Sequence, residues 1–289
     1  MLPKHQSFFW KAGSFRIKLS GKALIMGIVN VTPDSFSGDG VLAQYSREKV
    51  RGLSHALQLA DQGADILDIG GESSRPGALT ISPEDEAARV VPLIKALVKR
   101  VKVPLTVDTF KPFVARQALE AGASAVNLIK GTEPDESMLD IVRKFKAGLF
   151  LMHMRGTPAN MQTMTKYKDV VLEVREQLRK AVKACLCAGI KKDNLIIDPG
   201  IGFSKTTGQN LLLLKHLKKF TSLGFPILVG PSRKSFIGNT LMAGLDDRLP
   251  GTLASAVVAA TAGANILRVH DVKEIKQAIS MAYAIYSAE

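Results

Sequence analysis

Polar residues able to do chemistry stand at or just after the ends of short apolar runs in this 289-residue chain. The set comprises Asn30, Asp108, Asn127, His153, Asp198, Lys234, Arg268 and His270. Carboxylates and amides accept hydrogen bonds from nitrogen donors, whereas lysine, arginine and histidine bind anions. If one fold gathers these side chains, they can recognise a flat heterocycle rich in N–H donors that carries an anionic, phosphorylated tail.

Eight apolar runs with β-branched residues each precede an amphipathic stretch, and this alternation predicts the fold. The expected strands are 24–31, 66–70, 105–108, 125–129, 149–153, 195–198, 227–230 and 266–270. The expected helices are 46–62, 83–101, 111–121, 135–146, 168–188, 208–220, 249–262 and 272–287. Strict alternation implies parallel strands, and eight repeats favour a closed (β/α)8 TIM barrel in the α/β class.

The chain length fits one such barrel, which commonly needs about 250 residues. We therefore expect residues 1–289 to form a single domain, with the barrel over 24–287 and no linker. Residues 7–20 precede the first strand and read as a short hairpin that could plug the N-terminal mouth of the barrel.

In a barrel of this kind the active site lies at the carboxyl ends of the strands. Side chains alternate along a strand, so Arg268 and His270 share a face. Carboxylates and amides gather on one side of the mouth, and the basic residues follow strands seven and eight, where barrels commonly bind phosphate. Two long glycine-rich loops, at 30–44 and 70–85, are expected to close over the site, and Arg75 in the second is expected to bind an anion.

Composition narrows the function classes. The net charge of +13 comes from 39 basic against 26 acidic residues, but the basic residues are dispersed, and the single Trp argues against a nucleic-acid surface. The uncharged stretch 249–267 is rich in small residues and predicts a packed helix rather than a membrane span. Two free cysteines without an export signal indicate the cytoplasm.

Seven strings in the chain resemble the successive signatures of dihydropteroate synthases. They are MGIVNVTPDSFS (26–37), DIGGESSRPGA (68–78), VDTFKP (107–112), LMHMRGTPANMQ (151–162), DPGIGFSK (198–205), LVGPSRKSFIG (228–238) and RVHDVKE (268–274). The resemblance implies a folate-biosynthesis transferase that condenses 6-hydroxymethyl-7,8-dihydropterin diphosphate with 4-aminobenzoate, giving 7,8-dihydropteroate and pyrophosphate. It also implies a homodimer and inhibition by sulfonamides.

The same resemblance assigns roles to residues. The pterin would be held by Asp108, Asn127, Asp198 and Lys234, and the diphosphate by Asn30, Arg268 and His270, with Mg²⁺ bound through Asn30. The 4-aminobenzoate would lie near Phe36, Ser74, Arg75, Pro76, Phe203 and Ser232. Lys234, Arg268, His270 and Asp108 are the expected catalytic residues. No general base is assigned, because an aromatic amine is already unprotonated at neutral pH.

Some positions depart from the family pattern. Gly38 and Asp39 are swapped, Ser74 replaces threonine, Leu128 replaces aspartate and Phe110 replaces serine. The swap and Leu128 keep a catalytically weak paralogue open as an alternative. A corrinoid-type, pterin-binding methyltransferase module is another, although it has no need of SRKS at 232–235 or of Arg268 with His270.

Overall fold

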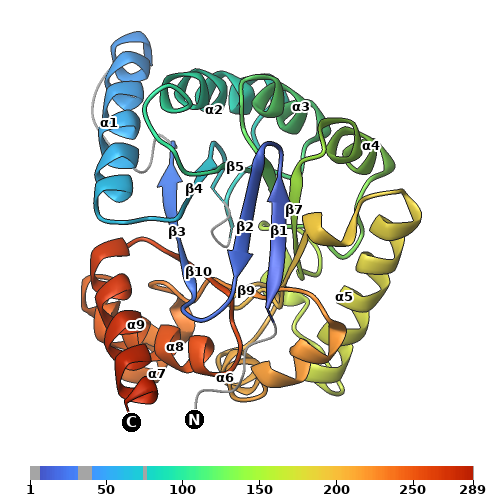
Figure 1. Cartoon of the computed structure of the whole chain (residues 1–289), viewed down its shortest axis with the longest axis vertical. Helices are drawn as coiled ribbons and strands as arrows, with labels where there is room; N and C mark the ends of the chain where they lie inside the picture. The colour runs from blue at the N-terminus through green and yellow to red at the C-terminus, as the bar shows by residue number, and fades with distance from the viewer. Residues whose placement is uncertain (1–6, 32–40, 74–76, 289) are drawn as a thin grey trace.

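The computed structural model describes residues 7–31, 41–73 and 77–288, with only the backbone described over 41–50. Its eight parallel strands form a nearly closed barrel surrounded by helices, as the alternation predicts (Figure 1). These strands are β3 (Leu24–Asn30), β4 (Ile66–Gly70), β5 (Leu105–Asp108), β6 (Ala125–Leu128), β7 (Gly148–Met152), β8 (Leu195–Asp198), β9 (Leu228–Val229) and β10 (Ile266–Val269). All lie within two residues of the expected bounds.

The strands follow the order β8-β7-β6-β5-β4-β3-β10-β9. Between the first and last strands of that order, a parallel bridge joins Ile197 to Ile227, and the amide of Ile197 donates to the carbonyl of Pro226 at 3.0 Å. These contacts bring the two edges of the sheet together, so the side chains that point inward share one enclosed interior.

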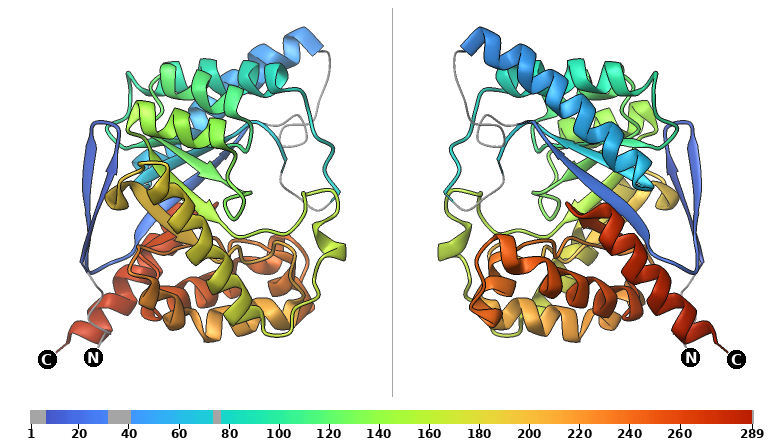
Figure 2. Two further views of the ribbon diagram at one scale, coloured as in Figure 1. Left: turned by 90° about the vertical axis from the view of Figure 1, so that its right-hand side faces the viewer. Right: turned by 90° about the vertical axis from the view of Figure 1, so that its left-hand side faces the viewer.

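The antiparallel hairpin of β1 (Phe8–Ala12) and β2 (Phe15–Leu19) lies across the end of the barrel that faces the viewer in Figure 1, and Figure 2 shows it along one side of the molecule. Trp10 is fully buried against the inward side chains of the strands, with its ring 5.1 Å from that of Phe150. Gly148 leaves room for it, because a Cβ there would lie 2.6 Å from the indole. The predicted plug is confirmed.

Nine helices are present in the described residues: α1 (Val41–Asp61), α2 (Pro83–Leu97), α3 (Pro112–Glu120), α4 (Glu136–Phe145), α5 (Val170–Cys187), α6 (Thr207–Lys215), α7 (Ser235–Leu241), α8 (Leu249–Thr261) and α9 (Val272–Ser287). Local sequence explains several starts: the hydroxyl of Ser82 accepts from the amide of Asp85 before α2, and Asp169 caps α5 in the same way. Several helix expectations were wrong. The helix expected over 46–62 already begins at Val41, and the one expected over 83–101 ends at Leu97. The stretch expected to be one helix over 208–220 is α6 followed by a 3-10 segment, Leu217–Leu223, and α7 was not predicted.

No helix among the described residues combines the length and the apolar character needed to cross a membrane. The uncharged stretch that begins at Leu249 forms the 13-residue α8 and then continues into β10.

Candidate functional site

The strand register brings polar side chains level at the carboxyl end of the barrel. Asn30 is paired with Gly70, Gly70 with Asp108, and Asp108 with Asn127. A Cβ at Gly70 would lie 3.6 Å from Oδ1 of Asn30 and 3.7 Å from Cβ of Asp108, so the two polar side chains flank this glycine. Three of the predicted site residues, from three neighbouring strands, thus form one layer.

Arg268 joins this layer to the one below it. Its Nη2 lies 2.7 Å from Oδ2 of Asp108 and its Nε lies 2.6 Å from Oδ2 of Asp68, a fully buried carboxylate on β4. Asp68 also accepts from Nδ2 of Asn127 at 3.0 Å and from the hydroxyl of Thr106. Charge-assisted hydrogen bonds of this kind hold both partners in fixed positions.

Asp68 belongs to this candidate site by its contacts, and the strand-end pattern missed it because it lies in the middle of its strand. A signal was present: in the strand sequence ILDIG the aspartate alone is charged, and it takes the inward place two residues after Ile66. A buried charge inside an apolar strand needs partners. Here the partners are residues of the predicted site.

Asn127 presents an acceptor without a partner. Because its Nδ2 donates to Asp68, its Oδ1 must point elsewhere, and this buried oxygen has no hydrogen-bond partner among the described residues. Beside it, burial raises the pKa of Asp108 to about 7, although the positive charge of Arg268 opposes the shift. This side of the mouth therefore offers acceptors to a ligand that brings donors.

Lys234 follows β9 and turns back over the mouth. Its Nζ donates to the carbonyl of Ile201 and lies 4.3 Å from the centre of the Phe203 ring. Burial lowers its pKa to about 7, while the charge of Asp198 acts in the opposite direction. Burial likewise raises the pKa of Asp198, whose Oδ1 accepts from the amide of Gly200 at 2.7 Å.

Ser232 and His270 meet between β9 and β10. The Ser232 hydroxyl lies 3.0 Å from Nδ1 of His270 and also accepts from the His270 amide at 3.2 Å. Next to them Arg233, at φ +55, pairs with Asp271 through Nε at 2.9 Å, which ties the two loops together. The hydroxyl and imidazole predicted from two different motifs are thus in direct contact.

An apolar wall completes the mouth. It consists of Ile129, Met152, Met154, Met161 and Phe203, with Phe110 packed against them. Phe110, one of the departures from the family pattern, therefore lies with a predicted substrate-binding residue. Leu128, another of these departures, is buried in the layer between strands and helices, so its side chain does not enter the mouth.

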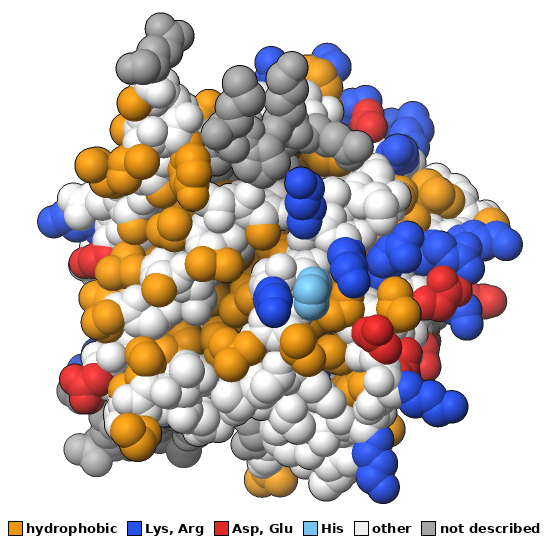
Figure 3. Space-filling model, turned by 90° about the horizontal axis from the view of Figure 1, so that it is seen from below, with side chains coloured by type: hydrophobic (Ala, Val, Ile, Leu, Met, Phe, Trp, Pro, Cys, Tyr) orange, Lys and Arg blue, Asp and Glu red, His pale blue; other side chains and the backbone are white. Residues whose placement is uncertain are grey.

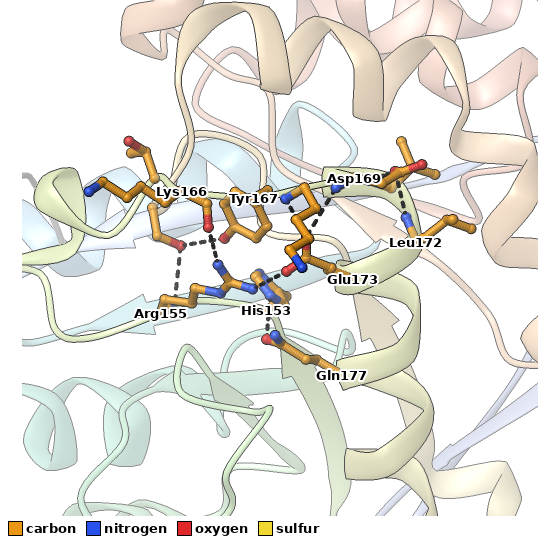
Figure 4. A network of polar contacts seen from close by, with 12 residues as sticks. His153, Arg155, Lys166, Tyr167, Asp169, Leu172, Glu173 and Gln177 are labelled. Carbon is orange, nitrogen blue, oxygen red and sulfur yellow. Dashed lines mark hydrogen bonds and ion pairs between the residues drawn. The ribbon is translucent and has the colours of Figure 1, made fainter.

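His153 is fully buried rather than exposed to the mouth. Figure 4 shows its ring beside Gln177 of α5, at 2.8 Å from Nε2 to Oε1, with Arg155 between Tyr167 and Glu173 nearby. Phe36, Ser74, Arg75 and Pro76, together with the swapped pair Gly38 and Asp39, lie outside the described residues. The described residues thus cover the barrel mouth without these predicted positions.

Known proteins are similar to this chain in sequence and in fold. Residues 26–270 match the family described as pterin binding enzyme. The dihydropteroate synthase of Escherichia coli K12 is 43% identical over 266 residues, 92% of each chain. The Xanthomonas albilineans dihydropteroate synthase with 4-aminobenzoic acid superposes with a TM-score of 0.89 at 41% identity, covering 98% of this chain and 100% of that one.

This chain belongs to the dihydropteroate synthase family. It is therefore a transferase of folate synthesis, and both the fold and the activity that the sequence motifs predict are confirmed. A second Xanthomonas albilineans dihydropteroate synthase structure, in complex with 7,8-dihydropteroate, has a TM-score of 0.84 at 36% identity and covers 97% of this chain and 99% of that one. A structure of the Yersinia pestis dihydropteroate synthase holds a sulfonamide drug complex, at 40% identity and a TM-score of 0.88 over 97% of this chain and 100% of that one.

Within this dihydropteroate synthase chain, the structure gathers nine predicted site residues at the barrel mouth: Asn30, Asp108, Asn127, Asp198, Phe203, Ser232, Lys234, Arg268 and His270. No cluster of three or more histidine, cysteine or acidic side chains able to hold a metal occurs in the described part of the chain.

Proposed function

We propose that the barrel mouth divides the dihydropteroate synthase reaction between an acceptor-rich half for the pterin and a basic half for the diphosphate. The carrying observation is the buried Oδ1 of Asn127, which has no partner among the described residues. An unsatisfied buried acceptor is costly, so it favours a ligand that donates. A pterin ring, with an amino group and ring N–H groups, is such a ligand.

Asp108 and Asp198 extend the acceptor half on either side of Asn127. A carboxylate accepts two parallel N–H donors in a fork, which matches the guanidine-like edge of a pterin. Lys234, held between the Ile201 carbonyl and the Phe203 ring, contributes a hydrogen-bond donor to the pterin ring. We assign these four residues to pterin binding.

The basic half consists of Asn30, Arg268 and His270. Arg268 lies at the boundary between the two halves, because it also pairs with Asp108. Mg²⁺ usually retains several waters and takes one or two protein oxygens together with substrate phosphates. Asn30, whose Oδ1 lies at the mouth beside Asp108, fits that donor set without a protein cage. When bound, Mg²⁺ would neutralise charge on the departing diphosphate.

The 4-aminobenzoate subsite is assigned to Phe203, Ser232 and the two loops. Phe203 offers an apolar surface, and Ser232 offers a hydroxyl already oriented by His270. Phe36, Ser74, Arg75 and Pro76 complete the proposal from the resemblance alone. A sulfonamide would occupy the same place.

In the proposed reaction the C–O bond between the pterin methylene and the diphosphate breaks, and the bonding electrons leave with pyrophosphate. The aromatic amine then forms the new C–N bond and releases its proton to solvent. Lys234, Arg268, His270 and Asp108 act by position and charge rather than by proton transfer. The enzyme therefore contributes charged side chains held in fixed positions around the substrates.

The test is incubation of the purified chain with the pterin diphosphate, 4-aminobenzoate and Mg²⁺. Equal amounts of dihydropteroate and pyrophosphate are expected. A folded chain that binds the pterin but releases neither product would indicate the weak paralogue. Methyl transfer from a methylated folate to a corrinoid acceptor would instead indicate the methyltransferase module.

We further propose that two copies of the whole-chain, single-domain enzyme associate in the cytoplasm through the helices near the C-terminus. Figure 3 shows hydrophobic side chains gathered over the side of one face that carries these helices. Large apolar residues are exposed there: Leu241, Met242, Leu245, Val258, Met281, Ile285 and Tyr286. Contiguous exposed apolar surface favours association.

Met242, 96% exposed, provides the test of the dimer. Light scattering after size exclusion should give twice the chain mass for the wild type and a lower mass for a Met242→Glu, Met281→Glu double variant. A wild-type monomer at micromolar concentration would contradict the dimer without affecting the assigned reaction.

A further inference from the structure

Lys205 is a lysine that the reaction does not use, and it lies buried directly behind the site. Its side chain is 3% exposed. Its Nζ lies 2.9 Å from the carbonyl oxygen of Gly200, 2.9 Å from that of Phe203 and 3.0 Å from Nδ1 of His153. No described carboxylate pairs with it within 4.0 Å, so its partners are neutral acceptors.

Burial lowers the pKa of Lys205 well below its ordinary value, and the charge of Asp198 opposes that shift. The hydrogen-bond pattern nevertheless matches a protonated amine. Burial, followed by the positive charge of Lys205, lowers the pKa of His153, which keeps its ring neutral. Nε2 faces the Gln177 oxygen at 2.8 Å and must donate to it, which leaves Nδ1 as the acceptor. An ammonium has three protons and here meets three good acceptors, whereas a neutral amine would leave one acceptor unpaired.

The segment after β8 is shaped around this ammonium. Gly200 and Ser204 both adopt positive φ, +68 and +48, which turn the chain back on itself. A Cβ at Gly200 would lie 1.9 Å from the carbonyl oxygen of His153, so only glycine fits beside β7. Ser204 offsets its strain through local bonds, donating to the Phe203 carbonyl at 2.8 Å and accepting from the Arg155 amide at 3.0 Å.

The same segment carries the pterin-binding groups. The Gly200 amide donates to the carboxylate of Asp198, and the Gly200 carbonyl accepts from Lys205. One residue thus connects the ammonium to the carboxylate proposed to bind the pterin. The Ile201 carbonyl accepts from Lys234, and the Phe203 ring lies beneath it. Displacement of this segment would therefore move Asp198 and Lys234 together.

We infer that Lys205 is a positioning residue for pterin binding: its ammonium holds the 198–205 segment, and through that segment Asp198 and Lys234, in their binding geometry. The inference rests on the proposed function of those two residues. Lys205 is assigned no contact with substrate. Its effect is transmitted by the carbonyls of Gly200 and Phe203 and by the neutral ring of His153.

The test is calorimetric binding of 6-hydroxymethylpterin, without diphosphate, to wild type and to Lys205→Met. Methionine keeps the length and removes all three donors, so the pterin dissociation constant should rise about tenfold or more. Lys183→Met is the matched control, because Lys183 is an exposed lysine on α5. It should bind as wild type does.

Rescue separates positioning from a purely structural role. In Lys205→Ala the vacated space should accept propylammonium, and this cation should restore part of the pterin affinity where isobutanol does not. A folded Lys205→Met that binds pterin within twofold of wild type would overturn the inference. So would a folded Lys205→Ala whose weakened binding responds equally to both additives.

Gln177→Leu gives a second test if neither Lys205 variant folds. Gln177 lies at the margin of the core, and its loss frees the His153 tautomer on which Lys205 depends. About threefold weaker pterin binding is expected, and unchanged binding would contradict the inference. Wild-type turnover is measured in parallel: an inactive wild type that does not bind pterin refutes the proposed function, and an active one leaves only Lys205 in question.

Discussion

The two ends of the barrel use the same inward positions for opposite purposes. At the N-terminal end, Ile66, Phe150 and Ile266 point inward and pack against the buried Trp10 of the hairpin. Two residues further along the same strands, Asp68 and Arg268 point inward and pair with each other at 2.6 Å. One end excludes water by apolar packing, and the other retains charge.

This difference separates stability from binding along a single strand. Apolar burial is favourable and non-directional, so the plugged end contributes to the free energy of unfolding. A buried ion pair such as Asp68 with Arg268 contributes little net stability, because desolvation offsets attraction. Its value lies in orienting Asn127 and Asp108 toward a ligand.

The largest expected effect is at the plugged end. Trp10→Ala should lower the free energy of unfolding by ~3–5 kcal/mol, since it leaves a cavity where an aromatic side chain was fully buried. Turnover per folded molecule should stay near that of wild type. Urea denaturation measures the free energy of unfolding, and kinetics normalised to the concentration of active sites measure turnover per folded molecule.

Phe9→Ala on the same strand is the control for that change, because Phe9 is 42% exposed and packs under Arg16 at 4.4 Å. It should cost far less stability. If Trp10→Ala instead abolished turnover in a still-folded enzyme, the assignment of stability to this end would be wrong.

At the polar end, Asp198→Asn should have the opposite effect to Trp10→Ala: activity should fall while stability is kept. It keeps the size and removes the charge that accepts pterin donors, so kcat/KM should fall by roughly 30- to 100-fold, corresponding to about 2–3 kcal/mol. Stability should be unchanged or higher, because burial raises the pKa of Asp198 and its ionised form is therefore disfavoured in the folded state. Loss of stability without loss of kcat/KM would contradict the assignment of substrate binding to this end of the barrel.

The pH profile provides a sharper comparison at the same end. Burial raises the pKa of Asp108 to about 7, so below that pH the carboxyl is protonated and no longer accepts two donors. Burial lowers the pKa of Lys234 to about 7, so above that pH its charge is lost. The pH dependence of kcat/KM, which reports the free enzyme, should therefore be bell-shaped with a narrow maximum near 7.

Lys234→Arg distinguishes the two limbs. Arginine stays charged throughout this range, so the alkaline limb of the pH profile should shift to higher pH, whereas the acid limb should stay at the same pH. An unmoved alkaline limb would mean that another group controls it.

The smallest expected effect concerns Ser232, whose hydroxyl contacts His270 at 3.0 Å. Ser232→Ala should raise the KM for 4-aminobenzoate by about fivefold, since one neutral hydrogen bond is worth about 1 kcal/mol. The KM for the pterin diphosphate should change less. Equal increases in both would show that Ser232 orients His270 rather than the aminobenzoate.

Much of the fold could be predicted because strands and helices alternate with clear periods, and a polar residue at the end of an apolar strand marks the mouth. Asp68 was missed because it ends no strand, although a buried charge at an inward position could have indicated it. The seven-residue α7 is too short for its apolar pattern to be distinguished from a loop. The role of Lys205 depends on carbonyls brought together by folding, which no spacing reveals.

The division of the mouth into a pterin half and a diphosphate half is the central claim, and paired titrations test it most directly. 6-Hydroxymethylpterin and its diphosphate ester are each titrated, with Mg²⁺ present, into wild type, Asp198→Asn and His270→Ala. Asp198→Asn should weaken both ligands equally, whereas His270→Ala should weaken only the diphosphate ester. Equal weakening of both ligands by His270→Ala would contradict the division.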